Sequence, residues 1–177
     1  MKVINLFAGP GAGKSTTAAG LFNMMKLLGY NVELVTEFAK DLTWEGRQGA
    51  LQNQLYILAK QEARLARLEG KVDFAITDSP LLLGLLYATP RWDKPWFKAA
   101  TLGVWSLYEN ISFFIERTKP YNEVGRNQTE AQAKQLDQDT RDMLQKAGVE
   151  YIGIKGNAKA PYTLYHYIKE NLNARRK

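Results

Sequence analysis

Five short apolar segments alternate with longer amphipathic segments along this chain of 177 residues. We predict buried strands at residues 3–7, 32–36, 72–77, 111–115 and 150–154. Between and after them, apolar residues recur at helical spacing, which predicts helices at 17–28, 49–69, 81–87, 96–109, 129–147 and 161–173. Strands that alternate with helices favour a parallel sheet with helices on both faces. We therefore expect one three-layer α/β domain that spans residues 1–177.

The first strand runs into a glycine-rich loop followed by Lys14 and Ser15, and a helix comes next. The loop reads Ala8-Gly9-Pro10-Gly11-Ala12-Gly13-Lys14-Ser15-Thr16. A strand, a glycine-rich loop, a Lys-Ser pair and a helix form the context of a phosphate-binding P-loop. Ala8 stands where the strict pattern has glycine. A glycine-rich turn with a chance Lys-Ser pair is the alternative interpretation.

Each part of this loop has a predicted role in binding ATP. Gly9, Gly11 and Gly13 allow the backbone N–H groups to curl around a phosphate, with Pro10, Ala12 and Thr16 completing the cradle. The helix that follows directs its positive end at the same anion. Lys14 would reach the β- and γ-phosphates, and the Ser15 hydroxyl would ligate Mg²⁺.

Two carboxylates, Glu37 and Asp78, follow the second and third predicted strands directly. Ligands gather at the carboxyl ends of strands in open α/β sheets, so both side chains are expected beside the P-loop. Asp78 is a candidate partner for Mg²⁺ or for an attacking hydroxyl. As alternatives, Glu37 could be a carboxylate stabilised at a helix N-terminus, and Asp78 could cap a helix that begins at Leu81.

A polar segment at 117–128 follows the fourth strand and carries Arg117, Lys119 and Arg126. In a kinase, such a segment is a lid that brings arginines onto the transferring phosphoryl group. An ordinary solvent-exposed loop is the alternative. The aromatic and basic residues near Trp92 could stack on a base, or they could pack a small subdomain.

Composition favours a soluble protein with a polyanionic partner. Apolar residues make up 45% and charged residues 24%, and the formal net charge is +6. This charge fits nucleic acid as a partner, although extra cations that hold nucleotide phosphates explain it equally well. There are no cysteines, no room for a signal peptide before the first strand and no apolar run long enough for a membrane helix. We expect a cytoplasmic protein without membrane contact, and a structural role for the single histidine, His166.

Three segments resemble bacteriophage P-loop kinases: NLFAGPGAGKSTTAAGL at 5–21, VTEFAKD at 35–41 and TDSP at 77–80. That group includes the hydroxymethyluracil DNA kinases, which are related to thymidylate kinases, and it is more distantly similar to nicotinamide riboside kinases. The resemblance implies the strand order 2-3-1-4-5 and transfer of the ATP γ-phosphoryl group to a hydroxyl. It implies that Asp78 or Glu37 is the base, and that Arg117 and Arg126 neutralise developing charge.

The leading hypothesis is an ATP- and Mg²⁺-dependent kinase that acts on a nucleoside-type hydroxyl. Net charge and resemblance favour the hydroxymethyl group of hydroxymethyluracil in phage DNA, which would place the protein in the host cytoplasm. A kinase of free nucleosides or nucleotides is the first alternative. An ATPase or nucleotide switch that acts on a protein or nucleic-acid partner is the second. The oligomeric state stays open, with a homodimer as one option.

Overall fold

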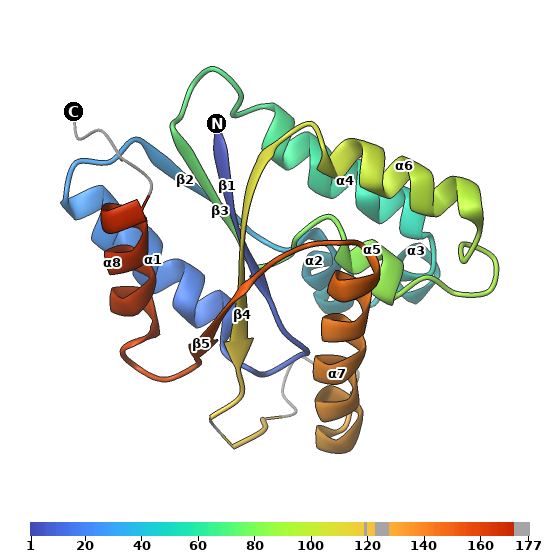
Figure 1. Cartoon of the computed structure of the whole chain (residues 1–177). Coiled ribbons are helices and arrows are strands. Elements are labelled where there is room, and N and C mark those ends of the chain that lie inside the picture. Colours follow the sequence, from blue (N-terminus) through green and yellow to red (C-terminus); the bar gives the residue numbers. More distant parts are fainter. Residues whose placement is uncertain (119, 123–127, 172–177) are drawn as a thin grey trace.

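A single five-stranded parallel sheet forms the centre of the computed structural model, which describes residues 1–118, 120–122 and 128–171. Its strands lie in the order β2-β3-β1-β4-β5 and all pair in parallel (Figure 1). They are β1 (Lys2–Phe7), β2 (Val32–Val35), β3 (Phe74–Thr77), β4 (Glu109–Glu116) and β5 (Ile152–Lys155). The predicted fold class and the strand order implied by the resemblance are confirmed.

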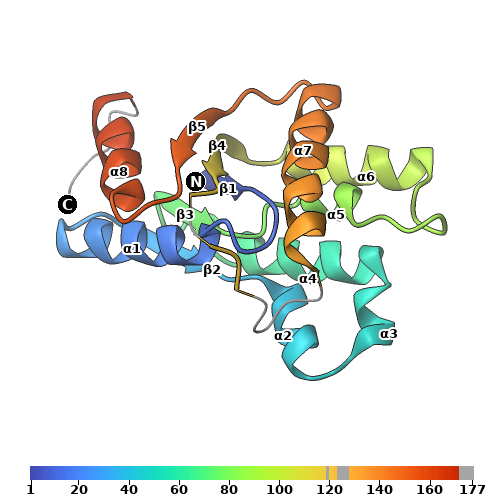
Figure 2. The ribbon, with the colours of Figure 1, turned by 90° about the horizontal axis from the view of Figure 1, so that it is seen from below.

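Helices cover both faces of the sheet (Figures 1 and 2). On one face lie α1 (Lys14–Leu27) and α8 (Ala160–Asn171), which pack against each other. The other face carries α4 (Gln54–Ala66), α5 (Leu83–Leu86), α6 (Pro95–Trp105) and α7 (Glu130–Lys146). Two short helices, α2 (Phe38–Trp44) and α3 (Gln48–Leu51), lie beyond the carboxyl end of β2. Within the described residues, no helix combines the length and the apolar character needed to cross a bilayer.

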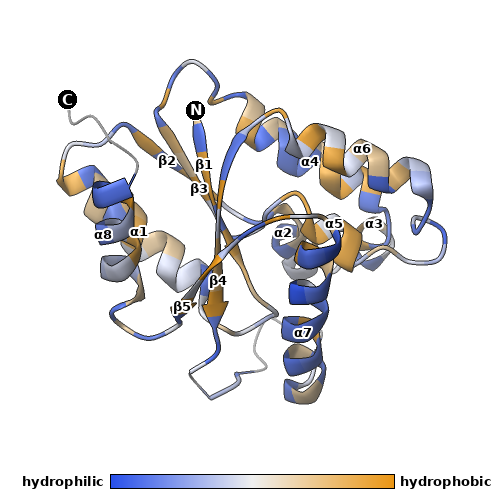
Figure 3. Cartoon of the chain, in the orientation of Figure 1, coloured by the Kyte–Doolittle hydropathy of each residue, from blue (hydrophilic) through white to orange (hydrophobic). Residues whose placement is uncertain are grey.

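The core is built around β1, which lies between β3 and β4. Val3, Ile4, Leu6 and Phe7 are fully buried, and each contributes about 1.5–3 kcal/mol by leaving water. Figure 3 shows the same distribution, with apolar strands at the centre and a largely hydrophilic α7 at the outside. Because β1 is the middle strand, the loop after it lies at the middle of the carboxyl edge of the sheet.

The predicted helix at 49–69 is two helices in the structure, α3 and α4. The break falls at Gln52 and Asn53, and the Asn53 side chain accepts a hydrogen bond from the Tyr56 N–H at 3.1 Å. Leucine spacing continues across the break, so periodicity alone missed it. Among the other differences, α2 was not predicted, α6 ends at Trp105 rather than at 109, and β4 begins at Glu109 rather than at 111.

Trp92 belongs to the core, so the packing interpretation holds for this residue. It is only 9% exposed, its ring contacts Trp96 and Phe97, and its Nε1–H donates to the Gln52 carbonyl at 2.7 Å. His166 lies on α8 against the rings of Tyr162 and Tyr165, in agreement with a structural role.

Candidate active site

The P-loop connects β1 to α1 and turns through two glycines in the left-handed region. Gly11 has φ +77° and Gly13 has φ +106°, values that side-chain-bearing residues rarely adopt. Gly13 is the N-cap of α1 and has no side chain to cap the helix. The first N–H groups of α1 are therefore left for an anion, which is the arrangement of a phosphate cradle.

The Lys14 ammonium lies back along this loop. Its Nζ donates to the carbonyl oxygens of Ala8 at 2.8 Å and Gly9 at 3.1 Å. Burial lowers the pKa of Lys14, and the carboxylates of Glu37, Asp78 and Asp137 oppose this effect. These carboxylates favour the protonated ammonium, which is the form of Lys14 that can bind a phosphate.

Glu37 and Asp78 leave neighbouring strands whose last residues pair, Val35 with Thr77. Asp78 is 5% exposed, and its Oδ1 is buried with no hydrogen-bond partner among the described residues. Burial raises the pKa of Glu37, the nearby Asp78 raises it further, and Lys14 opposes both. A carboxylate with a raised pKa is a suitable proton acceptor near neutral pH.

The two alternative interpretations have different outcomes. Glu37 does lie at a helix N-terminus, because it occupies the N-cap position of α2, and its side chain makes no capping hydrogen bond there. Asp78 lies well before α5, whose N-cap is Leu82. Both side chains are therefore available to the site.

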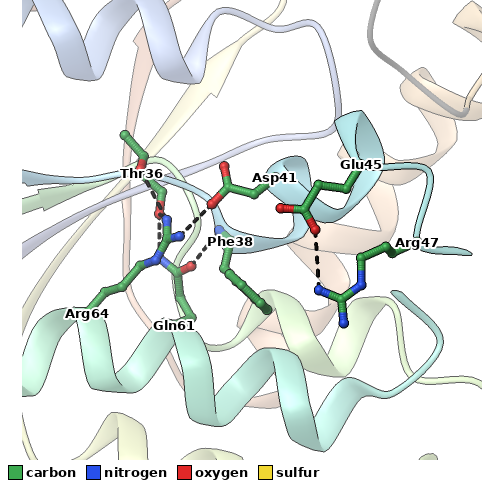
Figure 4. A network of polar contacts seen from close by, with 7 residues as sticks. All are labelled: Thr36, Phe38, Asp41, Glu45, Arg47, Gln61 and Arg64. Carbon is green, nitrogen blue, oxygen red and sulfur yellow. Dashed lines mark hydrogen bonds and ion pairs between the residues drawn. The ribbon is translucent and has the colours of Figure 1, made fainter. Parts of the chain in front are cut away.

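Gln61 of α4 holds the backbone on both sides of Glu37 (Figure 4). Its Oε1 accepts from the Phe38 N–H at 3.0 Å, and its Nε2 donates to the Thr36 carbonyl at 3.2 Å. Gln61 is 3% exposed, so these bonds lie in the interior. The position of Glu37 is thus set from a helix distant in sequence.

Arg64, one turn further along α4, holds the same segment. Its Nη1 donates to the Thr36 carbonyl at 3.0 Å, and its Nη2 pairs with Asp41 at 2.5 Å (Figure 4). The guanidinium also lies over the Phe38 ring, 5.3 Å from its centre. The sequence pattern at 49–69 predicts that the charges form mainly a solvated face, with Gln52, Asn53 and Arg64 as possible substrate contacts. The structure instead directs Arg64 at the protein backbone.

Arg117 is the first residue after β4 and reaches the P-loop. Its Nε donates to Asp137 Oδ2 at 2.9 Å, and its Nη2 donates to the Ala133 carbonyl at 3.4 Å. Its Nη1 is buried without a hydrogen-bond partner in the part of the chain that the structure describes. A β-carbon built on Gly11 would lie 3.3 Å from that Nη1. Arg126, the other predicted lid arginine, lies outside the described residues.

A cavity of about 490 Å³ opens beside the P-loop. The loop, Glu37 and Asp78 line one part of it. The other part is lined by side chains of α2 to α5, among them Trp44, Gln48, Leu51, Gln52, Gln54, Ile57 and Tyr87. Burial, and next the Glu37 carboxylate, raise the pKa of Tyr87, so its hydroxyl remains a hydrogen-bond donor. Of the residues in this wall, only Gln52 was named from sequence as a possible substrate contact; the rest of the wall and Asp137 were missed.

The residues predicted for Mg²⁺ fit that ion chemically. Mg²⁺ takes hard oxygen ligands and is commonly held by one or two protein groups together with waters and substrate phosphates. Ser15 and Asp78 both line the cavity, and the Asp78 Oδ1 is an unpartnered oxygen within the described structure. No group of three or more acidic, histidine or cysteine side chains that could hold a metal ion occurs among the described residues, so a metal cage made of protein ligands alone is not found there.

Comparison with known proteins identifies a family. A model of the AAA_28 family, described as an AAA domain, matches residues 3–160. The chain belongs to this family. No curated protein matches the sequence of this AAA_28 member. Among solved structures, its fold is similar to that of deoxyadenosine kinase from M. mycoides with bound dATP, with a TM-score of 0.55. The match covers 98% of this chain and 100% of that kinase at 17% identity, which supports the P-loop kinase fold.

Proposed function

We propose that this AAA_28 protein is an ATP- and Mg²⁺-dependent kinase that transfers the γ-phosphoryl group to a nucleoside-type hydroxyl. The observation that carries the proposal is the single cavity that joins the P-loop to Glu37 and Asp78. Phosphoryl transfer needs a phosphate cradle, a carboxylate that accepts a proton and a carboxylate that is free to hold a metal ion. One cavity brings candidates for all three together.

In the proposed mechanism the acceptor O–H donates its proton to Glu37 while its oxygen bonds to the γ-phosphorus. The bond between that phosphorus and the β–γ bridging oxygen breaks, and ADP leaves with the electron pair. Lys14 and Arg117 stabilise the charge on the phosphoryl oxygens. Ser15 and Asp78 would hold Mg²⁺, which would further neutralise the charge on the phosphates.

The wall of the cavity supports an acceptor that is uncharged away from its hydroxyl. Of the described residues that line the cavity, only Lys14, Glu37, Lys40 and Asp78 carry charge. Glutamine amides and apolar side chains make up most of the wall formed by α3 and α4. Amides can hydrogen-bond to the edge of a nucleobase, whereas a nucleotide acceptor calls for additional cations.

Different observations favour two different acceptors of this class. Net charge and motif resemblance favour hydroxymethyluracil in phage DNA, whose base must leave the helix to enter the cavity. The fold of deoxyadenosine kinase and a cavity close to the size of one small ligand favour a free nucleoside.

The deciding experiment offers γ-labelled ATP to free nucleosides, to nucleotides, and to duplex DNA with and without hydroxymethyluracil. Label on hydroxymethyluracil DNA alone supports the DNA acceptor, and label on free nucleosides alone supports the small acceptor. Label on nucleotides alone would contradict the proposal that the acceptor is uncharged away from its hydroxyl. Release of labelled phosphate with no labelled acceptor would make the protein an ATPase or a nucleotide switch.

Glu37→Gln and Asp78→Asn test the two carboxylates against matched surface controls. Glu33→Gln removes an exposed glutamate paired with Lys26, and Asp73→Asn removes an exposed aspartate before β3. We expect Glu37→Gln to lower kcat, and this fall in kcat to be largest near neutral pH. We expect Asp78→Asn to raise the Mg²⁺ concentration that activity requires. Small, equal effects on both variants and their controls would refute both roles.

A further inference from the structure

Asp137 joins the P-loop to Arg117 with one oxygen for each. Its Oδ1 accepts from the Gly9 N–H at 2.6 Å, and its Oδ2 accepts from Arg117 Nε at 2.9 Å. The Asp137 side chain is 18% exposed and that of Arg117 only 10%. Other aspartates of α7 make contacts within the helix, Asp139 with Gln135 and Asp142 with Gln138.

The contact depends on the lack of a side chain at Gly9. A β-carbon there would lie 2.5 Å from the Ala133 carbonyl oxygen and 2.8 Å from Asp137 Oδ1. The same Ala133 carbonyl, one turn before Asp137, accepts from Arg117 Nη2. One face of α7 therefore contacts the loop backbone and also holds two of the three guanidinium nitrogens.

The third nitrogen, Nη1, is the one directed at the phosphate cradle. It is buried and has no hydrogen-bond partner among residues 1–118, 120–122 and 128–171. A β-carbon built on Gly11 would lie 3.3 Å from this nitrogen and 2.9 Å from the ring of Tyr121, whose centre is 5.8 Å from the Arg117 Cζ. Arginine keeps its charge at any working pH, and its planar fork allows two nitrogens to be fixed while the third stays available. Such a nitrogen can donate a hydrogen bond to an anionic oxygen.

We infer that Asp137 is a positioning residue that holds Arg117 Nη1 over the P-loop to receive an oxygen of the γ-phosphate. Because one carboxylate binds both the loop and the arginine, their relative placement is fixed before the nucleotide arrives. Preorganisation of this kind lowers the cost of binding and of charge stabilisation. The inference rests on the proposed function only in its expectation that the γ-phosphate is transferred.

The test uses Asp137→Asn, Arg117→Ala and the double variant, with Asp142→Asn as control on the same helix. Asparagine keeps an oxygen for the Gly9 N–H but presents an N–H₂ group to Arg117 Nε–H, where no hydrogen bond can form. We expect Asp137→Asn to lower kcat at least tenfold, and Arg117→Ala to lower it further. In the Arg117→Ala background, Asp137→Asn should change kcat less than twofold. Independent, multiplying losses would overturn the inference.

A binding measurement separates this inference from the kinase proposal. Calorimetric titration with ATP and with ADP, without acceptor, reports the γ-phosphate contact even if no acceptor is ever found. We expect Asp137→Asn and Arg117→Ala to weaken ATP at least threefold and ADP less than twofold. Equal weakening of ATP and ADP by Asp137→Asn would make Asp137 a structural support of the loop and overturn the assignment.

If Asp137→Asn fails to fold, the Arg117→Lys variant tests the same inference. A lysine ammonium cannot bind Asp137 and Ala133 and also reach over Gly11, so the preference for ATP over ADP should fall as in Arg117→Ala. A preference equal to that of the unaltered protein would show that positive charge alone suffices, and would refute the positioning role.

Discussion

Replacing Gln61 by leucine removes the amide that holds the Glu37 segment while nearly conserving side-chain volume. Three contacts are lost: one to the Phe38 N–H, one to the Thr36 carbonyl and a long one of 3.5 Å to the Thr77 hydroxyl, which still accepts from the Ser79 N–H. Thr36 keeps its bond from Arg64 Nη1 at 3.0 Å, so its oxygen remains satisfied. The Phe38 N–H, at the start of α2, is left without its partner.

The expected cost follows from that one donor. An unsatisfied buried donor costs about 1–3 kcal/mol, and the contact at Phe38 is only partly buried, so we expect about 1–2 kcal/mol. For a chain of this size, that loss corresponds to a fall of about 2–8 °C in Tm. Activity should fall further if Glu37 is the base as proposed, because a shift of a catalytic group by about 1 Å lowers turnover by up to about a hundredfold.

Thermal and urea denaturation, together with kcat and KM for each substrate, test this expectation. Gln145→Leu is the matched control, because Gln145 is an exposed glutamine on α7. It should change stability by less than about 0.5 kcal/mol. A Gln61→Leu variant as stable as the control would show that Phe38 does not need this bond. A destabilised variant with unchanged kcat would show that Glu37 keeps its place without Gln61.

Three further changes have defined outcomes. Glu37→Gln should raise the free energy of unfolding at pH 7 and leave it unchanged near pH 4. Burial raises the pKa of Glu37 in the folded protein above 4.5, so ionisation of Glu37 destabilises the fold as the pH rises from 4.5 through that higher pKa. Equal shifts of the denaturation midpoint at both pH values would contradict this. Lys14→Ala should lower phosphoryl transfer at least about a hundredfold, whereas Lys26→Ala on the same helix should not; labelled-ATP assays that find transfer retained would remove the P-loop from catalysis. Gly9→Ala should destabilise the protein by about 1–3 kcal/mol in urea denaturation because its β-carbon collides with the Ala133 carbonyl; an unchanged midpoint would mean that α7 can withdraw freely.

The fold and the residues at the centre of the candidate site could be predicted because short contiguous segments of the sequence determine both. The P-loop is contiguous, and Glu37 and Asp78 each follow an apolar strand, so topology brings them to the same edge. Helix boundaries were less certain where leucine spacing continues through a break, as it does at Gln52. Roles in catalysis and metal binding stay predictions that the proposed variants test.

The supporting residues could not be assigned without coordinates because their partners are distant in sequence. Gly9 and Asp137 are separated by 128 positions. A signal was nevertheless present in the helical phase of each. Asp137 falls on the stripe of α7 that includes the buried Ala133, Thr140 and Leu144, and on α4 the buried Gln61 lies between Leu58 and Leu65. A polar side chain on an otherwise buried stripe indicates a specific internal partner.

The wall of the cavity is divided along the chain as well as in space. Among the described residues, 10–16 provide the phosphate loop, 37–89 provide almost all the rest of the wall, and only Gln128 joins them from elsewhere. Substitutions within the second stretch can therefore reshape the proposed acceptor side of the cavity without altering the loop sequence. A lineage built on this chain could diversify its substrates by changing one continuous segment. The same division offers a route for transplanting substrate preference between relatives as a single exchanged block.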